Sequence, residues 1–125
     1  MKREFGDYIQ DIIDSIKETE EFTKELSFDD FKEDKKTVNA VIRSLEIMGE
    51  AAKKIPDDLR RKYSKIPWKE MAGIRDKLIH EYHGVDLEII WKVVKEELPP
   101  VKPNILKMLK EFEHENKHEQ ERQPL

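Results

Sequence analysis

The residues best suited to chemistry stand together in the stretch RDKLIHEYHG, residues 75–84. Arg75 can bind a phosphate group through two parallel N–H donors, and His80 titrates near neutral pH. Asp76 and Tyr82 add a carboxylate and a phenol. On an ideal α-helix Asp76 and His80 share one face, so the carboxylate can orient the imidazole and raise its basicity. The stretch is therefore either a candidate active site or an ordinary polar helix face.

Helical geometry separates the two strongest candidates within this stretch. Arg75 and His80 are five positions apart, which offsets them by roughly 140° around a helix axis. They cannot both point at one spot along a single helix. Two arrangements bring them together: the long arginine side chain swings round, or a two-fold partner presents a second copy of the motif. The residues leave both arrangements open.

The histidines do not match a known metal-binding pattern. The run HEYH at 80–83 is one residue too short for the i, i+4 pair of a zinc protease. Glu-x-x-His occurs at 111–114 and 115–118, but di-iron bundles take one copy from each of two facing helices, and these copies lie in tandem. The chain has no cysteine, which excludes disulfides and thiolate ligands. We expect neither a metal nor a cofactor.

The elements that position this stretch are predicted to be helices, because apolar residues recur at spacings of three and four along most of the chain. Ser27 and Asp86 are expected to begin helices and Gly84 to end one. No strand pattern, repeat or glycine-rich loop interrupts this periodicity. The predicted fold is all-α, an antiparallel bundle of four to five main helices, with expected helical segments at 4–26, 28–55, 56–63, 67–82, 87–98 and 104–115.

The length and the apolar pattern indicate how the chain is organised. A chain of 125 residues suits one domain, expected at 1–115, followed by a polar tail at 116–125 that should fray. The first helix carries more large apolar positions than so small an interior can cover, so a homodimer is expected. No apolar run is long enough for a signal peptide or a membrane span, so we expect a soluble cytoplasmic protein without a membrane partner.

Charge is distributed unevenly along the chain. The net charge is -4, which argues against a general nucleic-acid binder. Between Lys53 and Lys77, however, nine basic residues stand against four acidic ones. This basic segment ends inside the 75–84 stretch, where an anionic substrate would need attraction. An ordinary solvated surface is the alternative explanation.

Several segments in one order resemble a known family. The stretch RDKLIHEY matches the Arg-x4-His-x-Tyr motif of HEPN-domain proteins, specifically the HepT-like toxins that are paired with minimal nucleotidyltransferases. NAVIRSLEIMGEAAKKIP is similar to that family's second helix, and IPWKEMAGIRDKLIHEY followed by VDLEIIWKVVKEELP is similar to its core run. The resemblance covers about Phe5 to Phe112. One departure is Asp76, where the family commonly has asparagine; it bears on how His80 is oriented and charged.

The resemblance implies a metal-independent ribonuclease that acts as a dimer, with two motif copies lining one cleft. In such a site His80 is the general acid and base, Arg75 stabilises the phosphate, and Asp76 and Tyr82 support them. The 2′-hydroxyl that is deprotonated also distinguishes RNA from DNA. The basic segment would then track the RNA backbone, and its candidate contacts are Lys53, Lys54, Arg60, Arg61, Lys65, Lys69 and Lys77.

The resemblance also implies a protein partner. A cognate minimal nucleotidyltransferase would act as antitoxin, as in type VII-like toxin–antitoxin pairs, and in some members it adds AMP to the motif tyrosine. That residue is Tyr82 here, where an added phosphate would occupy the cleft and repel RNA. The alternative function is a non-catalytic module that binds nucleotide or serves as an accessory subunit of a nucleotidyltransferase.

Overall fold

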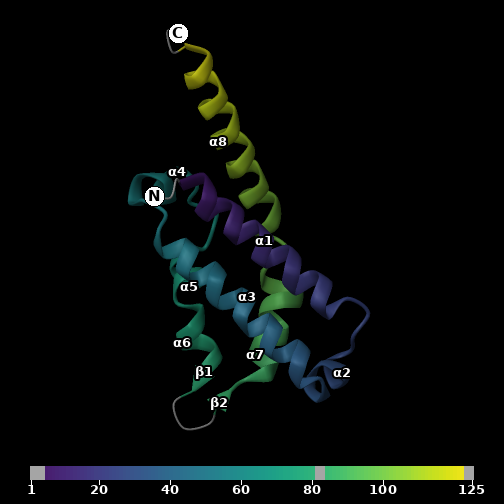
Figure 1. Cartoon of the computed structure of the whole chain (residues 1–125). Helices are drawn as coiled ribbons and strands as arrows, with labels where there is room; N and C mark the ends of the chain where they lie inside the picture. The colour runs from purple at the N-terminus through teal and green to yellow at the C-terminus, as the bar shows by residue number, and fades with distance from the viewer. Residues whose placement is uncertain (1–4, 81–83, 123–125) are drawn as a thin grey trace.

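The chain folds as an all-α protein. The computed structural model describes residues 5–80 and 84–122, with the backbone alone at 79–80 and 117–122. Figure 1 shows the arrangement of these elements. In chain order they are α1 (Phe5–Thr23), α2 (Phe28–Glu33), α3 (Lys35–Lys53), α4 (Asp57–Lys62), α5 (Trp68–Ala72), α6 (Ile74–Leu78), β1 (Ile79–His80), β2 (Gly84–Val85), α7 (Leu87–Lys92), the π-helix η1 (Val93–Glu97) and α8 (Lys102–Arg122).

The core is formed mainly by α1 and α3, with further buried residues from α5, α6, α7, η1 and α8. The helices α1 and α3 lie side by side, and α8 packs against α1 before it extends beyond the rest of the bundle (Figure 1). The apolar stripe that predicted α1 faces inward, since Ile9, Ile12, Ile13 and Ile16 are all fully buried. One cluster of buried apolar residues runs from Ile9 to Met108, so the elements share a single core.

The long helix expected at 28–55 is divided in the structure. Asp34 leaves helical geometry, with φ −101° and ψ 83°, and separates α2 from α3. Its carboxylate accepts hydrogen bonds from the backbone N–H and the hydroxyl of Thr37, at 3.1 and 2.6 Å. The aspartate thus acts as a new N-cap, which competes with continuation of the helix. The predicted cap before α2 is confirmed, because Ser27 and Asp30 form a reciprocal capping box.

A single arginine ties α3 to α4. Pro56 stands before the first residue of α4, as expected for this short helix. The guanidinium of Arg60 donates to the carbonyls of Ala52 and Ile55, at 2.7 and 2.9 Å. These carbonyls lie at the end of α3 or just beyond it, where no further helical turn would satisfy them. Arg60 therefore has a structural task that its charge alone did not indicate.

The helix expected at 67–82 ends early. Gly73 closes α5, α6 ends at Leu78, and the chain then continues as β1. The strand β1 pairs antiparallel with β2, with Ile79 opposite Val85 and His80 opposite Gly84. Gly84 has φ +73°, a conformation that favours glycine, so it serves this hairpin rather than a helix end. The sequence predicted no strand, and this prediction is wrong for these four residues, although the all-α class holds.

The second half of the chain contains one element that the sequence did not predict. Asp86 caps α7 as expected, with its carboxylate accepting from the N–H of Ile89 at 3.1 Å. The helix then widens into η1, where the N–H of Leu98 donates to the carbonyl of Val93 at 2.8 Å. Pro99 and Pro100 follow and turn the chain into α8. A π-turn of this kind places one extra residue in the helix just before it ends.

Two sequence expectations concern the surface. Helix α8 continues through Arg122 and so includes much of the tail at 116–125; that this tail frays stays a prediction. The structure buries more of the large apolar side chains of the first helix than the sequence led us to expect. Among the described residues the exposed large apolar side chains are Phe5, Phe22 and Leu106. No helix within the described ranges is long and apolar enough to cross a membrane.

Candidate functional site

The candidate site begins on α6, a short helix with one buried and one exposed side. Ile74 and Leu78 are buried in the core, whereas Arg75, Asp76 and Lys77 between them are exposed. Within the described part of the chain, Arg75 makes no side-chain hydrogen bond or ion pair. The guanidinium is therefore presented to solvent on a helix that is fixed by its apolar neighbours, an arrangement suited to binding an external anion.

Gly49 of α3 allows the segment that carries Arg75 to lie close to the bundle. A Cβ atom built at Gly49 would stand 2.9 Å from Cγ2 of Ile74 and 3.0 Å from the carbonyl oxygen of Met71. Real Cβ atoms essentially never come within 3.0 Å of a neighbour, so a larger residue would push α5 and α6 away from α3. The glycine of the Gly-Glu-Ala motif thus sets the position of the segment that leads to Arg75.

The structure places the other predicted site residues only in part. His80 lies on β1, two residues beyond the end of α6, so the helical face expected to join Asp76 and His80 is not formed. The 140° offset between Arg75 and His80 no longer applies for the same reason. The side chain of His80 and the whole of Tyr82 lie outside the described residues. The hairpin is held to α6 by the N–H of Asp86, which donates to the carbonyl of Leu78 at 3.1 Å.

The seven candidate RNA contacts differ in whether their side chains already form hydrogen bonds or ion pairs within the protein. The guanidinium of Arg60 already serves two carbonyls of the chain. Lys53 pairs with Glu50 at 3.3 Å and Lys77 pairs with Glu97 at 3.2 Å, and both pairs are exposed. Four others form no side-chain hydrogen bond or ion pair within the described ranges: Lys54, Arg61, Lys65 and Lys69.

These basic residues follow one side of the bundle. In Figure 1 the chain descends from α4, near the start of α1, through α5 and α6 to the hairpin at the opposite end. A hollow of about 440 Å³ lies along this path, lined by Arg61 and Lys69 among others. The path therefore leads from the exposed cations of α4 towards α6; that these cations attract an anionic substrate stays a prediction.

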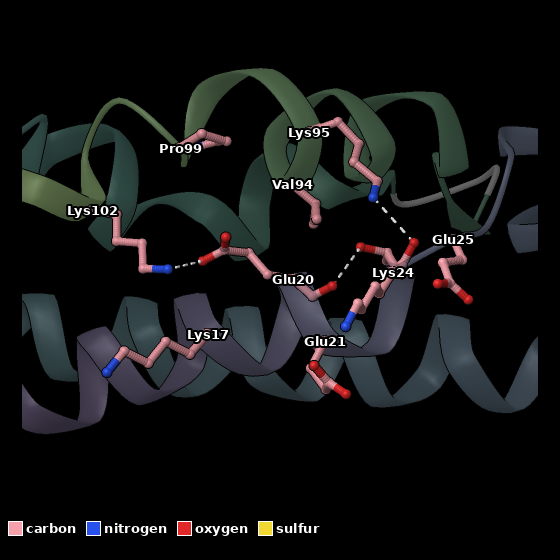
Figure 2. A pocket seen from close by; sticks show the side chains of 10 residues that line it. Lys17, Glu20, Glu21, Lys24, Glu25, Val94, Lys95, Pro99 and Lys102 are labelled. Carbon is pink, nitrogen blue, oxygen red and sulfur yellow. Dashed lines mark hydrogen bonds and ion pairs between the residues drawn. The ribbon is translucent and has the colours of Figure 1, made fainter.

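A larger hollow lies away from this segment. Figure 2 shows it between the C-terminal half of α1 and η1, with a volume of about 570 Å³. Lys102 pairs with Glu20 at 2.9 Å, and Lys95 donates to the carbonyl of Thr23 at 3.1 Å. Lysines and glutamates alternate around it and partly neutralise one another. Its residues include none of the predicted catalytic set, so its size does not make it the candidate active site.

An apolar hollow of about 290 Å³ lies directly beside α6. Ile74 and Lys77 contribute to it from α6 itself, and Glu97, which pairs with Lys77, stands at its rim. The remaining walls come from α3, α5, η1 and the turn before α8, and they are largely apolar: Met48, Met71, Val93, Leu98 and Val101. A partly open apolar surface thus adjoins the segment that presents Arg75.

Other groups that could do acid–base or metal chemistry are less suitable. Burial, and then the hydrogen bond from its hydroxyl to Glu111, raise the pKa of Tyr63, so this phenol stays protonated near neutral pH. No group of three or more His, Asp or Glu residues within the described ranges could hold a metal ion. The Arg75–His80 segment remains the best candidate for chemistry.

The fold and site together define a class: an all-α bundle that presents Arg75 on a short helix, with His80 on the strand that follows it. A comparison with family profiles finds a match to the family described as "Ribonuclease HepT-like" over residues 12–108. The chain belongs to this family. The matched range contains Arg75, His80 and Tyr82, as well as Gly49.

Related sequences agree with this assignment. The chain is 54% identical over 110 residues to a Thermococcus cleftensis protein named "Probable ribonuclease HepT", covering 88% of this chain and 100% of that protein. It is 44% identical over 117 residues to a Methanocaldococcus jannaschii protein named "Putative RNase MJ0127", covering 94% and 97% of the two chains. No solved structure matches the chain. The resemblance to the HepT-like family is thereby confirmed, and it supports a ribonuclease function.

Sequence reasoning missed two residues that shape the site. Gly49 belonged to a matched motif, but its role depends on a contact across 25 positions that no local pattern reveals. Arg60 was grouped with the RNA contacts because of its charge, although its place four residues after Pro56 could have suggested a role near the end of the preceding helix. Both residues act through tertiary contacts rather than through local sequence.

The close contact at Gly49 leads to a testable expectation. Gly49→Ala should lower the free energy of unfolding by about 1–3 kcal/mol, because the new methyl group overpacks the contact with Ile74 and Met71. Gly73→Ala is the matched control. Its Cβ would meet one atom within 4 Å, the carbonyl oxygen of Lys69 at 3.4 Å, and it should change stability by less than about 0.5 kcal/mol. Urea denaturation of both variants checks this, and equal stability of Gly49→Ala and wild type would contradict the account.

Proposed function

We propose that this protein is a metal-independent endoribonuclease in which Arg75 and His80 carry the reaction. The observation that supports this most directly is the exposed guanidinium of Arg75, fixed on α6 five positions before His80, inside the range that matches the ribonuclease family. Arg75 is close in sequence to buried anchors on both sides, Ile74 and Leu78, so its backbone is held while its side chain stays free.

The chemistry requires few groups. A histidine removes the proton of the RNA 2′-hydroxyl, and the 2′ oxygen forms a bond to the adjacent phosphorus. The bond from phosphorus to the 5′ oxygen breaks, and that oxygen receives a proton from a histidinium. Negative charge grows on the phosphate oxygens meanwhile, and a guanidinium that donates two hydrogen bonds stabilises it. Metal ions have no necessary part in these steps.

We propose that the protein acts as a homodimer. A single motif offers one histidine of this kind, whereas the reaction uses a base and an acid at the same time, and two copies of the motif would supply both. The apolar hollow beside α6 supports this arrangement, since a second chain that covered it would lie against α6, the helix that presents Arg75. The helical offset predicted from the sequence is no longer an argument for it.

The RNA backbone is proposed to follow the basic side of the bundle. Arg61, Lys65 and Lys69 form no pair within the described ranges and lead from α4 towards α6. A further candidate is Lys54, which also forms no pair within the described ranges. The set also includes Lys53 and Lys77, because exposed ion pairs such as theirs contribute at most about 1 kcal/mol and can exchange partners. Arg60 does not belong to this proposed set, because its guanidinium holds the end of α3.

The proposed partner is a cognate minimal nucleotidyltransferase in the cytoplasm, acting as antitoxin to this chain as toxin in a type VII-like pair. Transfer of AMP from ATP to the hydroxyl of Tyr82, with release of pyrophosphate, would add a phosphate close to His80 in sequence. A negative charge there would repel the substrate phosphate and neutralise Arg75. Asp76 is proposed to support the site by adjusting the charge of His80.

The catalytic assignment can be tested by substitution. Arg75→Ala and His80→Ala should each lower the rate of RNA cleavage by at least about 100-fold, the usual effect of removing an acid–base group or a transition-state donor. Lys17→Ala is the control, because this exposed lysine lines the hollow away from the site. EDTA should leave the wild-type rate unchanged.

The result that would contradict the assignment is cleavage by both variants at the wild-type rate. A wild-type protein that binds nucleotide or a nucleotidyltransferase without cleaving any RNA would instead support the alternative, a non-catalytic accessory subunit. Gel analysis of a labelled RNA and measurement of nucleotide binding distinguish the two functions.

The proposed modification gives a separate expectation. Incubation with the cognate nucleotidyltransferase, ATP and magnesium should add the mass of one AMP to wild type and to Tyr63→Phe, and nothing to Tyr82→Phe. Tyr63 is a suitable control because its hydroxyl is already engaged with Glu111. Intact-mass spectrometry and peptide mapping check this, and AMP found at another residue would contradict the role of Tyr82.

A further inference from the structure

A small basic hollow lies where the connection between α4 and α5 meets α8. Its volume is about 200 Å³. Three lysines from two distant parts of the sequence line it, Lys62 and Lys65 on one side and Lys107 on the other. Ser64 and Asn104 add a hydroxyl and an amide. We refer to these five residues as the lysine hollow.

Two partly buried hydrogen bonds hold the walls of the lysine hollow together. The hydroxyl of Tyr63, which also lines the hollow, donates to Glu111 on α8. The indole N–H of Trp68 donates to the carbonyl of Tyr63 at 3.1 Å, which fixes the same loop to α5. The two walls therefore keep a defined separation, and the lysines line a preformed concave surface.

Two carboxylates face these lysines from α8. Lys62 lies 3.6 Å from Glu115, and Lys107 lies 4.0 Å from Glu111. Lys65 forms no pair within the described ranges. The lysine side chains of the two pairs are 53% and 72% exposed, so the pairs are held weakly and a phosphate can replace the carboxylates. The donor set that remains is three ammonium groups, a hydroxyl and an amide, which suits a phosphodiester.

The position of the lysine hollow relates it to the proposed cleavage site. Lys65 precedes Arg75 by ten residues, most of them in α5 and α6, which corresponds to roughly 15 Å at the helical rise per residue. At about 3.4 Å per stacked nucleotide this is the reach of about four nucleotides. The hollow is thus too far away for the scissile phosphate, but within reach of the same RNA strand.

We propose that the lysine hollow is a phosphate subsite that binds the RNA strand several nucleotides away from the bond that Arg75 and His80 cleave. RNA as its ligand follows from the proposed function; the geometry of the hollow stands independently of it. The subsite recognises the sugar–phosphate backbone and reads no base. It favours RNA long enough to occupy both positions, and Glu115 acts against it by competing for Lys62.

Substitutions that remove positive charge from the lysine hollow, and one that removes negative charge beside it, test the subsite. Binding of 2′-O-methyl oligouridylates, which resist cleavage through the 2′-hydroxyl, is measured by fluorescence anisotropy over a range of salt concentrations. The Lys62→Gln/Lys107→Gln variant should bind a 12-nucleotide probe about 10-fold more weakly than wild type. For this variant, the slope of log binding constant against log salt concentration should be smaller in magnitude by about 1.4, the loss expected for two phosphate contacts with single strands. Glu115→Gln should bind the same probe about 2-fold more tightly, because Lys62 is released.

Two comparisons make the result specific. Lys17→Gln/Lys24→Gln removes the same charge from the hollow shown in Figure 2 and should leave binding of the 12-nucleotide probe unchanged. A 2-nucleotide probe, which cannot span both positions, should show a smaller difference between the lysine-hollow variant and wild type than the 12-nucleotide probe. Equal weakening by the two double variants, or weaker binding by Glu115→Gln, would overturn the subsite.

The outcome for the subsite is separable from that for catalysis. Cleavage of unmodified RNA by wild type, without the predicted binding pattern, would reject the lysine hollow and leave the proposed ribonuclease function intact. The predicted binding pattern without any cleavage would reject the catalytic proposal and retain the lysine hollow as an RNA-binding surface.

Discussion

The close approach of the α5–α6 segment to α3 is the contact on which the site depends. It is possible because Gly49 has no side chain, so that Ile74 and the carbonyl of Met71 occupy the space where a Cβ would stand. Ile74 and Leu78 are then buried, and the residues between them must face outward. Arg75 is exposed because of this packing, and the chain immediately after α6 is directed into the hairpin that carries His80.

The same packing separates residues with structural tasks from residues available to a substrate. Arg60 has the charge of an RNA contact but satisfies carbonyls at the end of α3, whereas Arg61, beside it, is exposed. A basic segment is therefore not uniformly a binding surface. The cations that lead towards α6 are those whose side chains no carbonyl or carboxylate of the described chain engages, and a polyanion would be attracted to that side of the bundle.

Much of the fold could be predicted from the sequence, because α1 and α3 carry regular apolar stripes and because Ser27, Pro56 and Asp86 mark helix starts. The points at which the expected helices are interrupted could not be predicted. Asp34 is compatible with a helix interior until its bonds to Thr37 are considered, and the division of 67–82 into α5, α6 and a hairpin reflects contacts with α3 and α7 rather than local propensity. For the site, the motif predicts Arg75 and His80, while the shape around Arg75 depends on long-range packing.

The central claim is that the catalytic unit combines the motifs of two chains. Mixing wild type with an equal amount of the His80→Ala protein, after dissociation and reassociation, tests it directly through the rate of RNA cleavage. Because one copy of His80 acts as base and the other as acid, a mixed dimer holds only one of the two histidines, and the rate should fall to about half of that of the same two proteins kept apart. A rate that stays the same, although mixed dimers form, would contradict the account.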